Sequence, residues 1–186
     1  IIPITLKAEL GENIDFFASD ISLQALSVAN LNAIKILESG IELFESDLLS
    51  QIPSEILSRI TIITANLPYV NKDWINFEKN NELQHEPQIA LYAQKNGLET
   101  IFNLIFQAQD LPKLQKIILE ADPSQFEEIE NYAKKCGFSK TYSENYTIVF
   151  EKNNPNRFMT FSSLNNLSSR ILLSVSGFYI IYLILF

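Results

Sequence analysis

The chain has 186 residues, 47% of them hydrophobic, and its 22 acidic and 14 basic side chains give a formal net charge of −8. This length suffices for one domain whose core needs no disulfide or metal to hold it together. The charge disfavours a general nucleic-acid-binding protein, because neutralising phosphates requires clustered Lys and Arg. We therefore expect a protein or a small molecule as partner, although a local basic patch is compatible with this composition.

Cysteine and histidine each occur once, as Cys136 and His85. One cysteine excludes an internal disulfide and a cysteine-rich metal site, and one histidine cannot supply a histidine-based zinc site, so we predict no metal. This cysteine usage fits a reducing compartment, and a cytoplasmic location is expected. The chain starts with Ile1-Ile2-Pro3, without an initiator Met or a charged leader, which predicts no signal peptide and a fragment of a longer protein.

Apolar runs and helix or strand breakers alternate along the chain. Residues 1–10 fit a helix or a strand, because their apolar positions suit both periods. In chain order the rest predicts a strand 14–18, a helix from the cap Ser22 to about Asn32, a strand 41–44, a helix 49–58, a strand 60–65, a helix 88–109 interrupted near Asn96-Gly97, a strand 114–120, a helix 123–135 with Pro in its first turn, and strands 138–142 and 147–151. This order indicates an α/β fold of three layers, with a mostly parallel sheet and an antiparallel terminal hairpin.

Three segments fall outside this alternation. Residues 70–87 form a long polar loop, which in a compact domain is usually functional or mobile. Residues 152–170 are rich in Asn and Ser and are predicted to be a linker after a domain of residues 1–151. Residues 171–186 form an apolar tail, but a helix of that length rises only about 24 Å against a hydrocarbon core of roughly 30 Å. A packed helix or a poorly ordered end is therefore favoured over a membrane anchor.

The predicted strand 60–65 ends at Asn66-Leu67-Pro68-Tyr69, and the carboxyl end of a parallel strand is where open α/β sheets bind ligands. The Asn66 amide both donates and accepts hydrogen bonds, Pro68 holds the preceding carbonyl in an extended geometry, and Tyr69 offers a stacking face. Together they could grip a planar amide or an exocyclic amine. The alternative is a turn in which Asn and Pro only break the strand.

Asp20 and Asp47 each follow a predicted strand, so we expect them at the same edge of the sheet as Asn66. In a nucleotide-like site, an acid after the second strand can accept hydrogen bonds from both ribose hydroxyls, and another acid can lie near the adenine. Either aspartate alone could instead cap a helix. Their agreement in position with Asn66 favours a binding site.

These residues belong to a longer series of motifs that occur in a fixed order. The series comprises Ser19-Asp20-Ile21-Ser22, Ala25-Leu26, Val28-Ala29, Asn32-Ala33, Ser46-Asp47-Leu48, Asn66-Leu67-Pro68-Tyr69, Glu86-Pro87 with Ala90-Leu91, Asn96-Gly97-Leu98, and Leu119-Glu120 followed by Gln125 and the closing hairpin. In this order it resembles the HemK-type release factor glutamine methyltransferases over about residues 1–151. The resemblance implies a Rossmann-like methyltransferase fold.

The resemblance also implies an activity: transfer of a methyl group from S-adenosylmethionine to the side-chain nitrogen of a glutamine in a peptide chain release factor. Asp20 would then hold the cofactor ribose, Ile21 would also belong to the cofactor site, and Asp47 and Leu48 would border the adenine. Asn66, at the cofactor and the substrate, would act with Leu67, Pro68 and Tyr69 to clamp the glutamine amide. Glu86 and Pro87 would contribute to substrate binding.

Two departures from the family pattern matter. Leu67 stands where the family usually has a proline, and Asn-Leu-Pro-Tyr is also similar to the loop of ribosomal RNA adenine dimethyltransferases, so an adenine N6-methyltransferase acting on RNA or DNA is the leading alternative. The family's Gly-rich cofactor loop would precede Ile1. We therefore expect a truncated chain whose sheet lacks its first, central strand, with weak or absent cofactor binding, and an inactive remnant is the third possibility.

Overall fold

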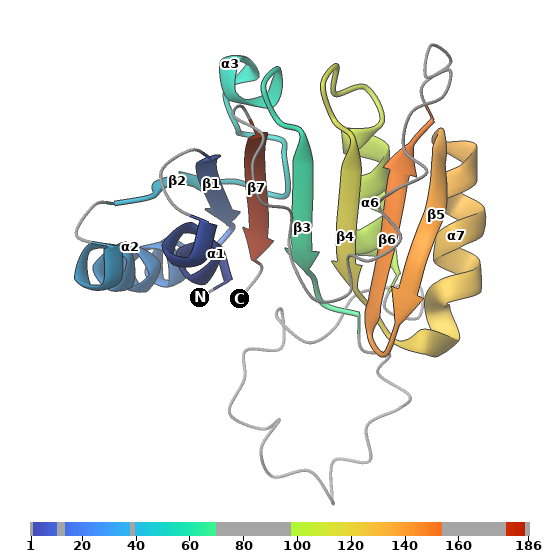
Figure 1. The fold of residues 1–186 in the computed structure, drawn as a ribbon, viewed down its shortest axis with the longest axis horizontal. Coiled ribbons are helices and arrows are strands. Elements are labelled where there is room, and N and C mark those ends of the chain that lie inside the picture. The colour runs from blue at the N-terminus through green and yellow to red at the C-terminus, as the bar shows by residue number, and fades with distance from the viewer. Residues whose placement is uncertain (1, 11–13, 38–39, 70–97, 154–177, 185–186) are drawn as a thin grey trace, which may run out of the picture.

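The computed structural model describes residues 2–10, 14–37, 40–69, 98–153 and 178–184 (Figure 1). Its elements are α1 (Ile2–Leu10), β1 (Ile14–Asp20), α2 (Leu23–Leu37), β2 (Glu42–Glu45), α3 (Ser54–Leu57), β3 (Ile62–Asn66), α6 (Glu99–Ala108), β4 (Lys116–Glu120), the 3-10 turn η3 (Pro123–Gln125), α7 (Phe126–Lys135), β5 (Phe138–Glu144), β6 (Thr147–Lys152) and β7 (Phe178–Ile184). The predicted loop 70–87 and the part 88–97 of the predicted helix 88–109 lie outside the described residues.

The strands form one sheet in the order β2-β1-β7-β3-β4-β6-β5. Pairing is parallel from β2 to β4 and antiparallel from β4 through β6 to β5. Strand β1 is buried without interruption from Phe16 to Asp20, as expected for a parallel strand with neighbours on both sides and helices above it. The predicted α/β fold, a mostly parallel sheet closed by an antiparallel hairpin, is confirmed.

The centre of the sheet differs from the prediction. We expected a gap where the first strand of the family would lie, but β7 occupies the position between β1 and β3 and pairs with both in parallel. The helix considered for residues 171–186 is therefore wrong over residues 178–184. A uniformly apolar run suits a strand buried on both faces as well as a helix, and pairing with two neighbours gives the strand its backbone hydrogen bonds. The division into a domain 1–151, a linker 152–170 and a tail 171–186 stays a prediction.

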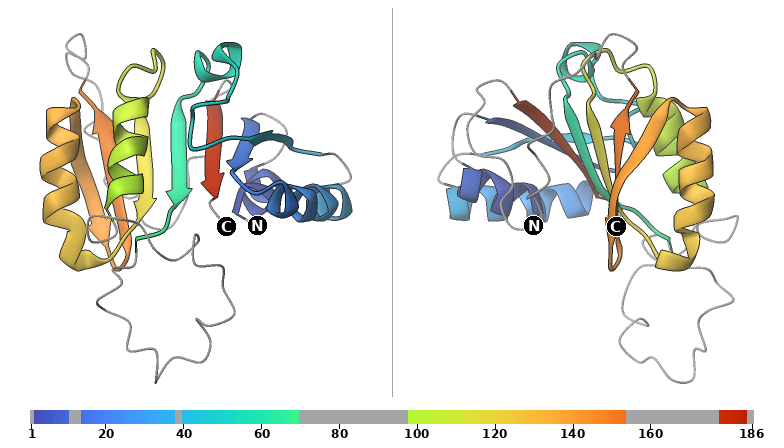
Figure 2. Two further views of the ribbon diagram at one scale, coloured as in Figure 1. Left: turned by 180° about the vertical axis from the view of Figure 1, so that it is seen from behind. Right: turned by 45° about the vertical axis from the view of Figure 1, so that its right-hand side comes forward.

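Helices cover both faces of the sheet, as Figure 2 shows: α1 and α2 lie on one side and α6 and α7 on the other. The larger core lies with α6 and α7, where the side chains of Leu104, Ile117, Ile129 and Phe150 have no solvent exposure. A smaller core forms beside α1 and α2 around Ile4, Phe16, Ala33 and Ile41. The fold therefore has the three predicted layers, with unequal packing on the two faces.

Local sequence explains where several helices begin and end. Residues 2–10 adopt the helical alternative, and α2 runs to Leu37, past the predicted end near Asn32, because no Pro or Gly occurs before Gly40. The helix predicted over 49–58 shrinks to α3. Leu48 has a φ of 54°, outside the helical region, and α3 begins only after Pro53.

The turn before α7 follows its predicted chemistry. Pro123 opens η3, and Asp122 and Gln125 form a capping box. The side chain of Asp122 accepts a hydrogen bond from the backbone N–H of Gln125, and the side chain of Gln125 accepts one from the backbone N–H of Asp122. Among the helices in the described part of the chain, none combines the length and the apolar character needed to cross a bilayer.

The different burial of two leucines, one on α6 and one on α2, predicts different losses of stability on substitution by alanine. Leu104→Ala on α6 removes a side chain without solvent exposure, and we expect the free energy of unfolding to fall by about 2–5 kcal/mol. Leu31→Ala on α2 is the matched control, because that side chain is 68% exposed, and a change within about 0.5 kcal/mol is expected. Urea unfolding measures both, and equal losses would contradict the described packing.

Candidate functional site

The carboxyl ends of the strands bring polar side chains into one row across the sheet. Asp20 at the end of β1 pairs in register with Glu45 of β2, and Asn66 at the end of β3 pairs with Glu120 of β4. Ile184 of β7 is the register partner of Asn66. Because the strands are parallel, Asp20, Asn66 and Glu120 lie at one edge of the sheet, which we call the polar rim.

Asp20 is a buried residue at the rim. Its side chain belongs to a residue only 2% exposed, and Oδ1 accepts a hydrogen bond from the backbone N–H of Ser22 at 2.7 Å. The cap of α2 is Ser22, whose Oγ accepts from the N–H of Ala25 at 3.2 Å. The capping alternative considered for Asp20 therefore applies to Ser22, and the Asp20 carboxylate orders the turn before the helix.

A cavity of about 820 Å³ lies beside this turn, between α1, α2 and the ends of β1 and β2. Its walls are mostly apolar, and Ser19, Asp20, Ser22 and Asn32 supply polar groups. This size and lining are typical of sites for small molecules and cofactors. Of the residues predicted to bind the cofactor, Asp20 and Ile21 line the cavity, whereas Asp47, Leu48 and Asn66 do not.

The loop after β2 is held by its neighbours. The carbonyl of Leu48 accepts hydrogen bonds from the hydroxyls of Ser19 at 3.2 Å and Ser46 at 2.9 Å, and the backbone N–H of Leu49 donates to Oε1 of Gln107 at 2.9 Å. Leu48 is only 2% exposed and packs in the larger core, so its side chain faces away from solvent. Asp47 is exposed, so its carboxylate is accessible to a ligand.

The segment Asn66-Leu67-Pro68-Tyr69 combines one exposed residue with a buried anchor. Asn66 is exposed, whereas Leu67 is 2% exposed and belongs to the larger core. The leucine that departs from the family's usual proline thus fixes the segment to the protein interior. The Leu67 carbonyl stays in the backbone that follows Asn66.

Two residues that were not predicted as site residues hold Tyr69. The Tyr69 hydroxyl donates to Oε1 of Glu120 at 3.0 Å, and Nε2 of Gln125 donates to the Tyr69 carbonyl at 2.8 Å. Glu120 could have been found from the sequence, because it ends a strand at the rim. The role of Gln125 could not have been found from the sequence, because the capping box already explains a glutamine at this position without any contact to Tyr69.

The surroundings of Tyr69 change its acidity. Burial first, and then the charge and hydrogen bond of Glu120, raise the pKa of the Tyr69 phenol from 10.0 to about 12. The phenol is therefore neutral near pH 7 and donates its proton to Glu120. The neutral ring offers a flat surface rather than a charged group.

Curated proteins with similar sequences share one activity in their names. Over 124 residues the chain is 36% identical to the release factor glutamine methyltransferase of Borreliella burgdorferi, with 65% of this chain and 41% of that protein covered. Over 114 residues it is 38% identical to that of Leptospira interrogans, with 60% and 39% covered. The chain is a relative of the release factor glutamine methyltransferases. It spans about two fifths of the length of these two relatives.

The chain was also compared with further curated proteins, with protein-family models and with solved structures. A bifunctional methyltransferase of Rickettsia felis is 31% identical over 140 residues, which cover 74% of this chain and 26% of that protein. No protein-family model matches the chain. The solved ribosomal protein L11 methylase of Lactobacillus delbrueckii subsp. bulgaricus superposes with a TM-score of 0.48 at 14% identity, over 81% of this chain and 77% of that one. The fold of this chain is assigned from its own strand order, described above.

The structure thus brings Asp20, Ile21, Asp47 and the segment 66–69 of this methyltransferase relative to one edge of the sheet, and it buries the side chains of Leu48 and Leu67. Glu86 and Pro87, predicted to bind the substrate, lie outside the described residues. The roles assigned to all these residues stay predictions.

The raised pKa of Tyr69 predicts a late titration. The absorbance of tyrosinate, taken as the difference between the unchanged chain and Tyr69→Phe, should change with a midpoint near pH 12. In Glu120→Gln the midpoint should move toward 10, because the charge and its repulsion of tyrosinate are removed, while burial keeps it above 10.

The same shift predicts how stability depends on pH. The folded pKa lies above the unfolded one, so the contribution of Tyr69 is fully present below pH 10 and is lost as the pH rises from 10 to 12. Unfolding in urea across this range, for the unchanged chain and for Tyr69→Phe, should give curves that converge toward pH 12. A difference titration centred near pH 10 would contradict the burial of this phenol.

Proposed function

We propose that this chain carries the S-adenosylmethionine and glutamine-amide sites of a release factor glutamine methyltransferase. One observation supports the proposal above the others: Asp20 and Asn66 end two parallel strands and lie in one row of the polar rim. In the resemblance noted from sequence, these residues serve the cofactor and the substrate. The names of the curated relatives agree with methyl transfer to a glutamine.

The residues of the rim fit this cofactor. Asp20 adjoins the cavity of about 820 Å³, and a carboxylate there can accept hydrogen bonds from two ribose hydroxyls. The exposed Asp47, in the loop after β2, is the proposed neighbour of the adenine. S-adenosylmethionine supplies an electrophilic methyl group on a positively charged sulfur. Carboxylates at the ends of several strands favour such a cation; they are Asp20, Glu45, Asp47 and Glu120.

The segment 66–69 fits a glutamine side chain. An amide nitrogen is a poor nucleophile, because its lone pair is delocalised into the carbonyl. Oδ1 of Asn66 and the carbonyl of Leu67 are the proposed acceptors for the two amide hydrogens, an arrangement that localises electron density on the nitrogen. Holding the amide in line with the methyl group can supply on the order of 7–11 kcal/mol of the barrier reduction. No general base is required before the transfer.

Tyr69 is proposed to position this segment. Its hydroxyl is tied to Glu120 and its carbonyl to Gln125, so the backbone that carries Asn66 is fixed from the far side by β4 and η3. A neutral ring can lie against the flat amide without competing for the sulfonium. Fixing both ends of a short segment restricts the positions that Asn66 can take.

An adenine N6-methyltransferase remains the alternative, because Asn-Leu-Pro-Tyr suits an exocyclic amine as well as an amide. The polar rim disfavours it, since its carboxylates repel the phosphates that flank a target base. Retention of RNA or DNA by the chain at low salt, with loss at high salt, would favour this alternative over the glutamine amide.

The cofactor proposal predicts a loss of affinity in Asp20→Asn. The substitution keeps an acceptor for the N–H of Ser22 but removes the charge, and hydrogen bonds to charged groups contribute about 1.5–3 kcal/mol, so affinity should fall at least about tenfold. Asn103→Ala, at an exposed position on α6, is the control and should bind normally. Calorimetry with S-adenosylmethionine measures both. Equal affinity in the two variants would overturn the role of Asp20.

The substrate proposal predicts a different pattern for Asn66→Ala. The cofactor affinity should change less than threefold, whereas transfer of labelled methyl groups to a release factor should fall by about a hundredfold, because one of two amide acceptors is lost. Peptide mass spectrometry locates the label. Label on any residue other than glutamine, or equal transfer by Asn66→Ala and Asn103→Ala, would refute this assignment.

A further inference from the structure

The sheet consists of two parts that are joined only through β7. Among the described strands, β2 and β1 form one part, and β3, β4, β6 and β5 form the other. Strands β1 and β3 do not pair with each other, and each pairs in parallel with β7. The two halves of the polar rim therefore belong to different parts of the sheet, with Asp20 on one and Asn66 on the other.

The register of β7 sets the position of these two residues. Ser19 pairs with Leu183, so Asp20 comes level with Ile184, and Ile184 is also the partner of Asn66. Asp20 and Asn66 are thus two strand spacings apart, or about 9.5 Å between their backbones. A shift of the β7 register by one residue would displace one half of the polar rim relative to the other half. The side chains of the shifted half would then point to the opposite face of the sheet.

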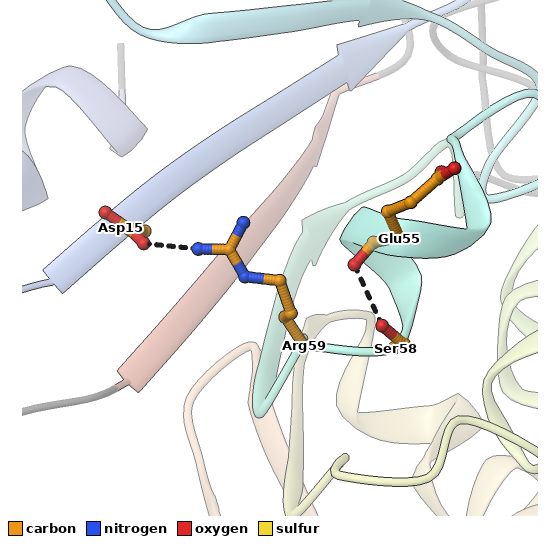
Figure 3. Close-up of polar contacts among 4 residues, drawn as sticks. All are labelled: Asp15, Glu55, Ser58 and Arg59. Carbon is orange, nitrogen blue, oxygen red and sulfur yellow. Dashed lines mark hydrogen bonds and ion pairs between the residues drawn. The ribbon is translucent and has the colours of Figure 1, made fainter.

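Other contacts besides β7 also link the two parts: Phe17 of β1 packs in the larger core, and the loop after β2 is bonded to Gln107 of α6. Across the amino-terminal end of β7, Arg59 reaches from the segment before β3 to Asp15 of β1, with Nη2 and Oδ2 2.9 Å apart (Figure 3). Both side chains are substantially exposed, at 40% and 54%, and exposed ion pairs contribute little. This pair lies at the end of the strands opposite to the polar rim. The backbone ladders of β7 are the contacts that fix the register of Asp20 against Asn66.

We propose that β7 is a positioning element of the site: docking of residues 178–184 between β1 and β3 sets the distance between Asp20 and Asn66, so that strand docking and ligand binding at the rim stabilise each other. The ligand part of this statement rests on the proposed function, and the docking part does not. By linkage, a ligand that contacts both halves of the rim stabilises the docked strand by as much as docking favours the ligand.

Hydrogen exchange on the full chain tests the docking part. The amides of β7 should exchange as slowly as those of β1 and β3, because all three leave the sheet together. In Ile181→Pro, which removes an N–H from a central strand, the amides of β1 and β2 should exchange at least about tenfold faster. Those of β4 and β6 should change less, because they pack in the larger core.

Ile181→Val is the matched control, since it keeps a β-branched residue with its N–H, and it should leave exchange in β1 unchanged within about threefold. If Ile181→Pro does not fold, exchange in the unchanged chain still decides the matter. Rapid exchange of β7 beside protected β1 and β3 would overturn the proposal. So would a concentration-dependent dimer that loses its β7 protection on dilution, because the strand would then come from a second copy.

S-adenosylmethionine tests the linked part. At a concentration 100 times its dissociation constant, it should slow the exchange of β7 amides by about a hundredfold, in step with those of β1 and β3. Slow exchange in β7 without any effect of S-adenosylmethionine would leave the docking intact and count against the proposed function instead. Binding of S-adenosylmethionine with fast exchange in β7 would refute this inference and leave the proposed function standing.

Discussion

Parallel pairing is the constraint on which the site depends. In the ladder from β2 through β1, β7 and β3 to β4, every strand points the same way, so all carboxyl ends emerge at one edge. Asp20, Asn66 and Glu120 each occupy the last position of their strand. Hydrogen bonding between backbones thus places side chains that are far apart in the sequence in one row.

Neighbouring elements hold the loops at this edge, in addition to hydrogen bonds within the loop after β2 such as that from Ser46 to the carbonyl of Leu48. Ser19 of β1 bonds the carbonyl of Leu48 in the next loop, Gln107 of α6 bonds the loop again, and Glu120 and Gln125 hold Tyr69. Each anchor comes from an element that already belongs to the sheet or packs on it. The exposed groups, Asp47 and Asn66, therefore stand on a backbone with little freedom, which is what a site needs to orient a ligand.

Much of this arrangement could be predicted from local patterns, because the signals are local. Apolar runs that end at Asp or Asn predicted β1, β2 and β3, and with them the common edge of Asp20, Asp47 and Asn66. The Ser22 cap and the Pro123 turn follow from residue chemistry alone. The beginning of α3 was harder to predict, because Leu48 has a positive φ and its carbonyl is bonded by two hydroxyls, one of which comes from β1.

The part that could not be predicted is decided by long-range pairing. A run as apolar as residues 178–184 gives no period, and only the presence of two unpaired neighbours makes it a strand. No residue in β7 indicates that β1 and β3 would otherwise each have an open edge. The anchoring of Tyr69 is similar, since Glu120 and Gln125 lie more than fifty residues away in the sequence and meet it only in the folded sheet.

The two cores suggest why the acid-bearing part is the more adaptable one. Beside α6 and α7 the large core fixes β3, β4 and β6, and with them Asn66, and of β1 it includes Phe17. Beside α1 and α2 the core is small, the cavity adjoins Asp20, and apolar side chains of α2 such as Leu31 and Ile36 are exposed. Fewer buried contacts mean a lower free energy of local opening. A ligand that bonds Asp20 and Asn66 together would stabilise the weaker part through the stronger one, so binding energy would be used where packing contributes least.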